Sequence, residues 1–367
     1  MKVLHIITGN DDGGGAKHIL NLCLNSKEKM ECTIGCIGGG PFYKKAIKNN
    51  IECILFSPKA FIGREAEDYI VEKGFDIVNF HGAKAFFLAK FLKKKFGPPM
   101  VATVHSNYRQ DFLNSRVKHL LFTQLSISGL RSFDYFICVS NYIKSILNVD
   151  GIAGRKFVVP NGIDLKDCRV FSDCKEVRKS LGIEKEDFVF TMVARLHPVK
   201  NHTTLIMAFN RLRVEFENVK LLLIGDGEQK AELEAVAGEG VIFAGFRENV
   251  LDYINASDIT VLTSLSEGGA PPFAILESAA VGKTVIASSV SDIPHIINGG
   301  NGFLADPNSE ADIYLKMKEA YLNPQAILAM GENLNRLVRD KYSMERFSSN
   351  YYDAYKTIIE ESKVVKI

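Results

Sequence analysis

Two loops in the second half of the sequence contain the clearest candidates for chemistry. The first follows the apolar run FVFTMV and carries Arg195 and Lys200, five residues apart. A guanidinium and an ammonium group in one loop are two cations suited to binding a diphosphate leaving group. A solvated basic loop is the alternative interpretation of the same residues.

The second loop follows the run ITVLT and reads SLSEGGAPPFAILESAAVGKTVIASSVS, from Ser264 to Ser291. Glu267 lies in the loop itself, and Glu277 lies in the helix predicted after the two prolines. A carboxylate near a helix start can accept hydrogen bonds from two sugar hydroxyls, and the N–H groups there can bind phosphate. The alternative is a helix cap with a surface glutamate.

A third candidate lies near the start of the chain, where Gly13, Gly14 and Gly15 separate a predicted strand from a helix. Such a turn lets the backbone approach a phosphate closely. It lacks both the G-x-G-x-x-G spacing and a G-K-[ST] ending, so a tight turn without a ligand has equal weight.

The elements that must position these loops alternate between short apolar runs and stretches with helical spacing, which predicts parallel sheets built from βαβ units. We expect thirteen strands, seven in the first half of the chain and six in the second, at residues 2–8, 31–38, 51–56, 76–80, 101–104, 135–139, 156–159, 188–193, 220–224, 241–244, 259–263, 284–288 and 302–304. The predicted fold is α/β, with two doubly wound, Rossmann-like domains. Ligands bind such sheets at the carboxyl ends of strands, where all three loops lie.

The sequence resembles the family-4 retaining glycosyltransferases along nearly its whole length. The motifs, in family order, are GGGAKH, TVHS, CVS, VPNGID, ARLHPVKNH, LLIGDGE, FAGFREN, SDITVLTSLSEG, PFAILESAAVGKTVIAS and NGFLADP. The resemblance implies the GT-B fold, in which two domains face each other across a donor cleft and the last helix returns to the first domain. We therefore expect an acceptor-side domain of residues 1–166 plus 344–367 and a sugar-nucleotide-binding domain of residues 167–343.

The resemblance also implies roles for individual residues. Arg195 and Lys200 match the pair that binds the donor diphosphate, Glu267 matches the contact to the transferred sugar, and His105 matches a histidine near its primary hydroxyl. The implied donor-binding residues are Gly14, Gly15, Phe246, Arg247, Phe273, Ala274, Ile275 and the ribose-binding Glu277. The positive charges of Lys17, after the glycine turn, and of Arg109, in the basic segment 108–133, place both on the acceptor side independently of the resemblance.

Two positions depart from the family pattern. Nine residues separate Glu267 from Glu277, where the family usually has seven, which leaves open whether Glu267 keeps its contact with the sugar. Lys17 stands where the family often has a carboxylate or an amide, and it favours a negatively charged donor or acceptor.

The implied reaction is front-face transfer, in which the leaving phosphate takes the acceptor proton. The sequence offers no obvious nucleophile and no aspartate-x-aspartate motif in a suitable loop, so neither a metal nor another cofactor is expected. Seven cysteines without a paired C-x-x-C predict reduced thiols rather than a zinc site. Two rival functions remain open: a sugar-nucleotide 2-epimerase of the same fold and a non-catalytic sugar-nucleotide-binding protein.

The charge is distributed unevenly along the chain. Residues 1–160 hold 22 lysines and arginines against 13 acidic residues, while the whole chain has a net charge of +2. A basic half suggests an anionic partner, and residues 108–133 read as a basic amphipathic helix suited to a membrane interface. The alternative is that the apolar stripe of this helix packs into the domain core.

The expected partners are a nucleotide-diphosphate sugar, with UDP as its nucleotide, and a glycan or lipid-linked acceptor. Without a recognised motif, nucleic-acid binding is not expected. With no apolar run long enough to span a bilayer and no signal peptide, we expect a cytoplasmic protein that can bind the inner face of the membrane.

Overall fold

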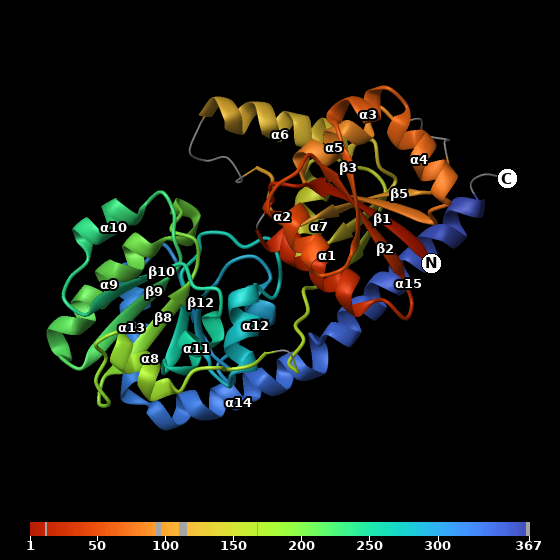
Figure 1. Ribbon diagram of the computed structural model, residues 1–367. Coiled ribbons are helices and arrows are strands. Elements are labelled where there is room, and N and C mark those ends of the chain that lie inside the picture. Colours follow the sequence, from red (N-terminus) through yellow and green to blue (C-terminus); the bar gives the residue numbers. More distant parts are fainter. Residues whose placement is uncertain (12, 93–96, 110–115, 167, 365–367) are drawn as a thin grey trace. The chain divides into compact units, whose positions relative to one another are not determined.

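The computed structural model describes residues 1–11, 13–92, 97–109, 116–166 and 168–364 (Figure 1). The chain divides into two units, Met1–Asn161 with Met344–Ile367, and Gly162–Ser343. The junction predicted after residue 166 lies close to the end of the first segment. Each unit has its own parallel sheet and its own core.

The first unit contains a seven-stranded sheet with the order β3-β2-β1-β4-β5-β6-β7, and every pair in it is parallel. Its strands are β1 (Lys2–Thr8), β2 (Glu31–Ile37), β3 (Glu52–Phe56), β4 (Ile77–His81), β5 (Met100–Val104), β6 (Tyr135–Cys138) and β7 (Arg155–Val158). The strand order reverses between β1 and β4. The chain after β1 continues into a helix on one face of the sheet, and the chain after β4 continues into a helix on the other. Such a switch point is where open α/β sheets bind ligands.

Helices cover both faces of this sheet, which explains why its strands are almost continuously apolar. One face carries α3 (Pro58–Ile62), α4 (Glu65–Lys73), α5 (Ala83–Ala89), α6 (Arg116–Leu130) and α7 (Asn141–Val149). The other carries α1 (Gly14–Asn25), α2 (Pro41–Lys48) and the last helix, α15 (Met344–Val364). Tyr351 and Tyr355 of α15 are fully buried against this face. The last helix therefore completes the core of the first unit, as predicted.

The described part of α6 packs on α5. Gly129 lies so close to the backbone of Phe86 that a Cβ atom there would be 2.6 Å from its carbonyl carbon. Lys90 donates a hydrogen bond to Ser128, and Leu130 is fully buried. This end of the predicted amphipathic helix thus contributes to the domain core; the side chains of residues 110–122 lie outside the described residues. Among the described helices, none is both long and apolar enough to cross a membrane.

The second unit contains a six-stranded parallel sheet with the order β10-β9-β8-β11-β12-β13. Its strands are β8 (Phe188–Val193), β9 (Val219–Ile224), β10 (Val241–Gly245), β11 (Ile259–Leu262), β12 (Val285–Ser288) and β13 (Phe303–Ala305). The order reverses between β8 and β11. The two charged loops of the sequence follow these two strands, so the sheet brings them to its switch point.

Helices again cover both faces. Helices α9 (His202–Glu215), α10 (Lys230–Val236) and α13 (Glu310–Leu322) pack on one face, and α8 (Cys174–Ser180), α11 (Val250–Asn255) and α12 (Phe273–Ala280) lie with the other. Helix α14 (Pro324–Lys341) packs against α12 and α13. All thirteen predicted strands are present, with ends shifted by one residue at most.

Candidate active site

The loops after β8 and β11 are joined by hydrogen bonds. The amide of Leu265 donates to the carbonyl of Val199 (2.8 Å), and the hydroxyl of Thr263 donates to the carbonyl of Lys200 (3.2 Å). These bonds follow from the parallel pairing of β8 with β11, which places their carboxyl ends side by side. The two charged loops of the second unit therefore form one surface.

Lys200 and Glu267 form an ion pair on this surface, between Nζ and Oε1. Their side chains are only 24% and 11% exposed, so the pair is poorly solvated compared with a surface salt bridge. The sequence predicted both residues for the site but not their contact. Glu267 thus holds the ammonium group of Lys200 in place.

Arg195 is the exposed cation of the same loop, with 66% of its side chain accessible. Its Nη2 lies 3.6 Å from Oε1 of Glu228, and Nε2 of His197 lies 3.5 Å from the same oxygen. Burial lowers the pKa of His197, with Arg195 adding to the effect, which favours the neutral ring. Glu228 and His197 were missed as site residues although both lie within recognised motifs, LLIGDGE and ARLHPVKNH.

The glycine turn after β9 fits tightly against the loop that carries Arg195. A Cβ atom on Gly225 would lie 2.0 Å from the carbonyl oxygen of Ala194, and one on Gly227 would lie 2.3 Å from that of Leu196. The φ of Gly225 is +146°, a conformation that residues with a side chain rarely adopt. The turn therefore needs glycine for both steric and conformational reasons.

We expect Gly225→Ala to lower the free energy of unfolding by about 1–3 kcal/mol, because the new methyl group must displace a backbone carbonyl. Chemical denaturation would measure the change. Gly299→Ala is the matched control, since a Cβ atom there has no neighbour within 4 Å. Equal stability of the two variants would contradict the tight fit of the turn.

Helix α12 begins with the residues predicted to contact the donor. Phe273 and Ala274 are half-buried in its first turn, and Glu277 is half-buried one turn further on. The amide of Ile275 donates to the carbonyl of Pro272 (3.0 Å) and is therefore already used within the helix.

The segment after β10 projects outward. Phe246 is 75% exposed, and the guanidinium of Arg247 lies 5.4 Å from the ring centre of Tyr253. An exposed phenyl ring beside a cation is suited to a planar aromatic ligand such as a base. This geometry accords with the predicted role of these residues, which stays a prediction.

In the first unit the structure brings Gly15 and His105 together. A Cβ atom on Gly15 would lie 3.3 Å from Cδ2 of His105, and Gly14 is the first residue of α1. Gly13 is the N-cap of α1, and its amide donates a hydrogen bond to Oδ1 of Asp11 (2.9 Å). The glycine turn and the imidazole thus adjoin each other at the carboxyl edge of the sheet.

His105 ends a chain of three hydrogen-bonded imidazoles. Its Nε2 lies 2.9 Å from Nδ1 of His81, and Nε2 of His81 lies 3.0 Å from Nδ1 of His5. Burial lowers the pKa of both His81 and His105 well below the usual range, so the rings are neutral and their tautomers are coupled. His81 was missed; its position at the carboxyl end of β4 was the available signal.

A fourth histidine packs against this chain. The ring of His18 lies edge-on to His105 with centroids 4.7 Å apart, and its two nitrogens contact Oδ1 of Asn161 (2.9 Å) and the hydroxyl of Tyr351 (2.7 Å). Burial lowers the pKa of His18 to about 4. The last helix therefore supports the predicted site through Tyr351 and His18.

The two predicted acceptor residues lie in different settings. Lys17 is half-buried in the first turn of α1, next to the glycine turn. Arg109 is paired with Asp150, whose carboxylate is buried and also accepts a hydrogen bond from Tyr108. Arg109 therefore already has an anionic partner that the sequence did not predict.

Solved structures with this fold include sugar-nucleotide complexes. Anabaena HepE in complex with UDP superposes with a TM-score of 0.83 at 19% identity, covering 97% of this chain and 100% of that one. HepE in complex with UDP-glucose gives 0.82 at 20% identity over the same shares. The two parallel sheets and this likeness define a GT-B fold.

Sequence comparison adds the family. Residues 13–167 match the model described as Glycosyltransferase Family 4, and residues 173–337 match Glycosyl transferases group 1. The chain belongs to the family-4 glycosyltransferases and is a retaining glycosyltransferase.

Two curated relatives have assigned activities. The UDP-Gal:alpha-D-GlcNAc-diphosphoundecaprenol alpha-1,3-galactosyltransferase of Escherichia coli is 28% identical over 77% of this chain and 75% of its own length. The alpha-monoglucosyldiacylglycerol synthase of Streptococcus pneumoniae is 27% identical over 72% of this chain and 65% of its own.

Proposed function

We propose that this enzyme transfers a hexose or N-acetylhexosamine from a UDP-sugar to a lipid-linked glycan or glycolipid in surface polysaccharide or glycolipid synthesis. The observation that carries the proposal is the pair of cations, Arg195 and Lys200, in one loop at the switch point of the second sheet. The galactosyltransferase named above pairs UDP-galactose with a lipid-linked sugar acceptor, and the synthase is named for a glycolipid product.

In the proposed reaction Arg195 and Lys200 bind the diphosphate and stabilise the charge that develops as it leaves. Glu267 and Glu228 hold these cations before the donor binds. When the donor arrives, Arg195 can leave its exposed contact with Glu228 at little cost, because such pairs contribute about 0–1 kcal/mol. Lys200 keeps its ion pair with Glu267, and we propose that Glu267 also contacts the transferred sugar.

The remaining residues bind the donor and the acceptor. Glu277 accepts the ribose hydroxyls, Phe246 and Arg247 contact the base, and the first turn of α12 meets the sugar and phosphate. In the first unit the turn at Gly14 and Gly15 approaches the donor phosphate and the acceptor, and His105 lies near the primary hydroxyl of the sugar. Lys17 and Arg109 lie on the acceptor side.

The departing phosphate takes the acceptor proton, so the reaction requires no protein nucleophile. We expect it to need no metal or other cofactor at the donor site, where the two cations carry out the neutralisation that a divalent ion would otherwise provide.

Donor screening by thermal shift tests this function. At a fixed ligand concentration, the rise in unfolding temperature increases with the affinity of the ligand. We expect UDP-glucose, UDP-galactose or UDP-N-acetylglucosamine to stabilise the enzyme more than GDP-mannose does. Preferential stabilisation by GDP-mannose would contradict the proposed nucleotide.

We also place the enzyme in the cytoplasm, at the inner face of the membrane. The excess of positive charge in residues 1–160 supports this, because a cationic surface is attracted to anionic headgroups. We expect cosedimentation with vesicles of anionic phospholipid, none with neutral vesicles, and weaker binding as salt rises. Failure to bind anionic vesicles even at low salt would favour an acceptor in solution.

A further inference from the structure

Three side chains that bind soft metals meet inside the first unit. His5 comes from β1, Cys32 from the start of β2 and Cys23 from α1, which covers this face of the sheet. One ring nitrogen of His5 and the two sulfurs all lie within 4.8 Å of one another. The three residues come from three different elements of the core, so the fold itself holds them together.

His5 has a free nitrogen at this position. It is fully buried, and its Nδ1 is occupied by the hydrogen bond to His81. Its Nε2 is buried and makes no hydrogen bond with any described residue. A buried polar atom without a partner is costly, and this one therefore requires an explanation.

We propose that His5, Cys23 and Cys32 bind one thiophilic d¹⁰ cation, for which Zn²⁺ is the representative ion. Two cysteine sulfurs and an imidazole nitrogen are the donors that zinc prefers, and hard cations such as Mg²⁺ require oxygen ligands instead. With both thiols ionised, a divalent cation makes the three-ligand centre neutral, which suits a buried site. The bond takes up the Nε2 lone pair.

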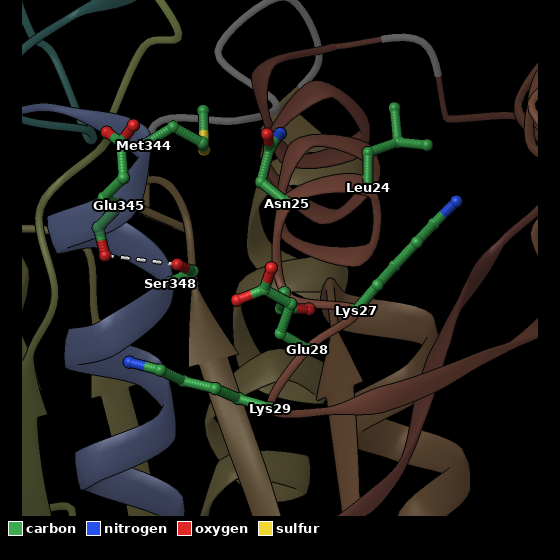
Figure 2. Close-up of a pocket in the computed structure, with 9 residues that line it drawn as sticks. Leu24, Asn25, Lys27, Glu28, Lys29, Met344, Glu345 and Ser348 are labelled. Atoms are coloured by element: carbon green, nitrogen blue, oxygen red, sulfur yellow. Dashed lines mark hydrogen bonds between the residues drawn. The ribbon is translucent and has the colours of Figure 1, made fainter.

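The surroundings of the sulfurs support a bound ion. The hydroxyl of Ser26 lies 3.5 Å from Sγ of Cys32, where it can orient that ligand. Ser26 also lines a surface cavity of about 410 Å³ between the turn after α1 and the start of α15 (Figure 2). Glu28 and Glu345 line the same cavity together with Lys27 and Lys29.

Metal binding would also determine which nitrogen donates in each hydrogen bond of the imidazole chain. A cation on Nε2 of His5 leaves the proton on Nδ1, which then donates to Nε2 of His81. His81 in turn donates from Nδ1 to Nε2 of His105, and the remaining proton of His105 sits on its own Nδ1. The ion therefore has a structural role that extends to His105 and takes no part in the chemistry at the diphosphate.

Titration of the reduced, metal-free full-length enzyme with Co²⁺ under anaerobic conditions tests the site. We expect a sulfur-to-cobalt charge-transfer band that saturates at one equivalent and disappears when Zn²⁺ is added. In Cys23→Ser and in Cys32→Ser the apparent affinity should fall roughly tenfold or more, because loss of a supporting group alone can have that effect.

Cys53→Ser is the matched control, since Cys53 is a partly buried thiol on the neighbouring strand β3 and lies outside the cluster. It should bind Co²⁺ like the wild type, and cooperative unfolding followed by circular dichroism verifies that each variant is folded. The proposal is overturned if the wild type gives no charge-transfer band, or if the folded Cys23→Ser and Cys32→Ser variants retain the full band.

Discussion

Replacing Arg195 or Lys200 with alanine is expected to lower kcat by roughly 10²-fold or more, the effect of removing a charge-stabilising group from a transition state. Both cations lie in the loop after β8, at the switch point of the second sheet. Because their contacts strengthen as the diphosphate leaves, kcat should fall more than the affinity for the donor. Steady-state kinetics with the preferred UDP-sugar would measure both quantities.

Arg211→Ala provides the matched control for Arg195→Ala. Arg211 lies on α9 of the same unit, is about as exposed, and also contacts a glutamate, with 3.8 Å between its Nη1 and Oε2 of Glu310. Its loss should leave kcat unchanged. Near wild-type turnover in Arg195→Ala would rule out its assignment to the diphosphate.

The second large effect concerns the two glutamates. Glu277→Gln should weaken the binding of UDP and of the UDP-sugar alike, roughly tenfold or more, because hydrogen bonds to a charged group contribute about 1.5–3 kcal/mol. Glu267→Gln should leave UDP affinity nearly unchanged and lower kcat, since it removes a contact to the transferred sugar, which UDP lacks. Calorimetric titration with UDP measures the affinity, and steady-state kinetics measures kcat, so the two experiments separate the roles of the two glutamates.

Glu232→Gln on the exposed face of α10 is the control, and it should change neither quantity. If both site variants lost UDP binding equally, the longer spacing between the glutamates would have exchanged or merged their roles. The ion pair places Glu267 beside Lys200, which is assigned to the diphosphate, whereas Glu277 is assigned to the ribose.

The strands and the loops that follow them could be predicted because most strands are short apolar runs that helices bury on both faces. FVFTMV and ITVLT show this pattern, and the charged loops come directly after them. The strand order then determines which loops meet. Family motifs supplied the residue roles, which the apolar pattern alone does not contain.

The partners of the site residues could not be predicted, because they depend on pairing between distant parts of the chain. Lys200 meets Glu267 across 67 positions only because β8 lies beside β11. The same holds for Arg109, whose pairing with Asp150 spans 41 positions. The imidazole chain from His5 to His105 arises from three neighbouring strands or their ends, and no local spacing reveals it.

The most direct test of the central claim is an NMR analysis of the product formed from each UDP-hexose with N-acetylglucosaminyl-diphosphoundecaprenol or diacylglycerol as acceptor. The account predicts that one donor gives an α-linked product, with the anomeric configuration of the donor retained, and one equivalent of UDP for each sugar transferred. A β-linked product, or conversion of the UDP-sugar to its C2 epimer in the absence of acceptor, would contradict it.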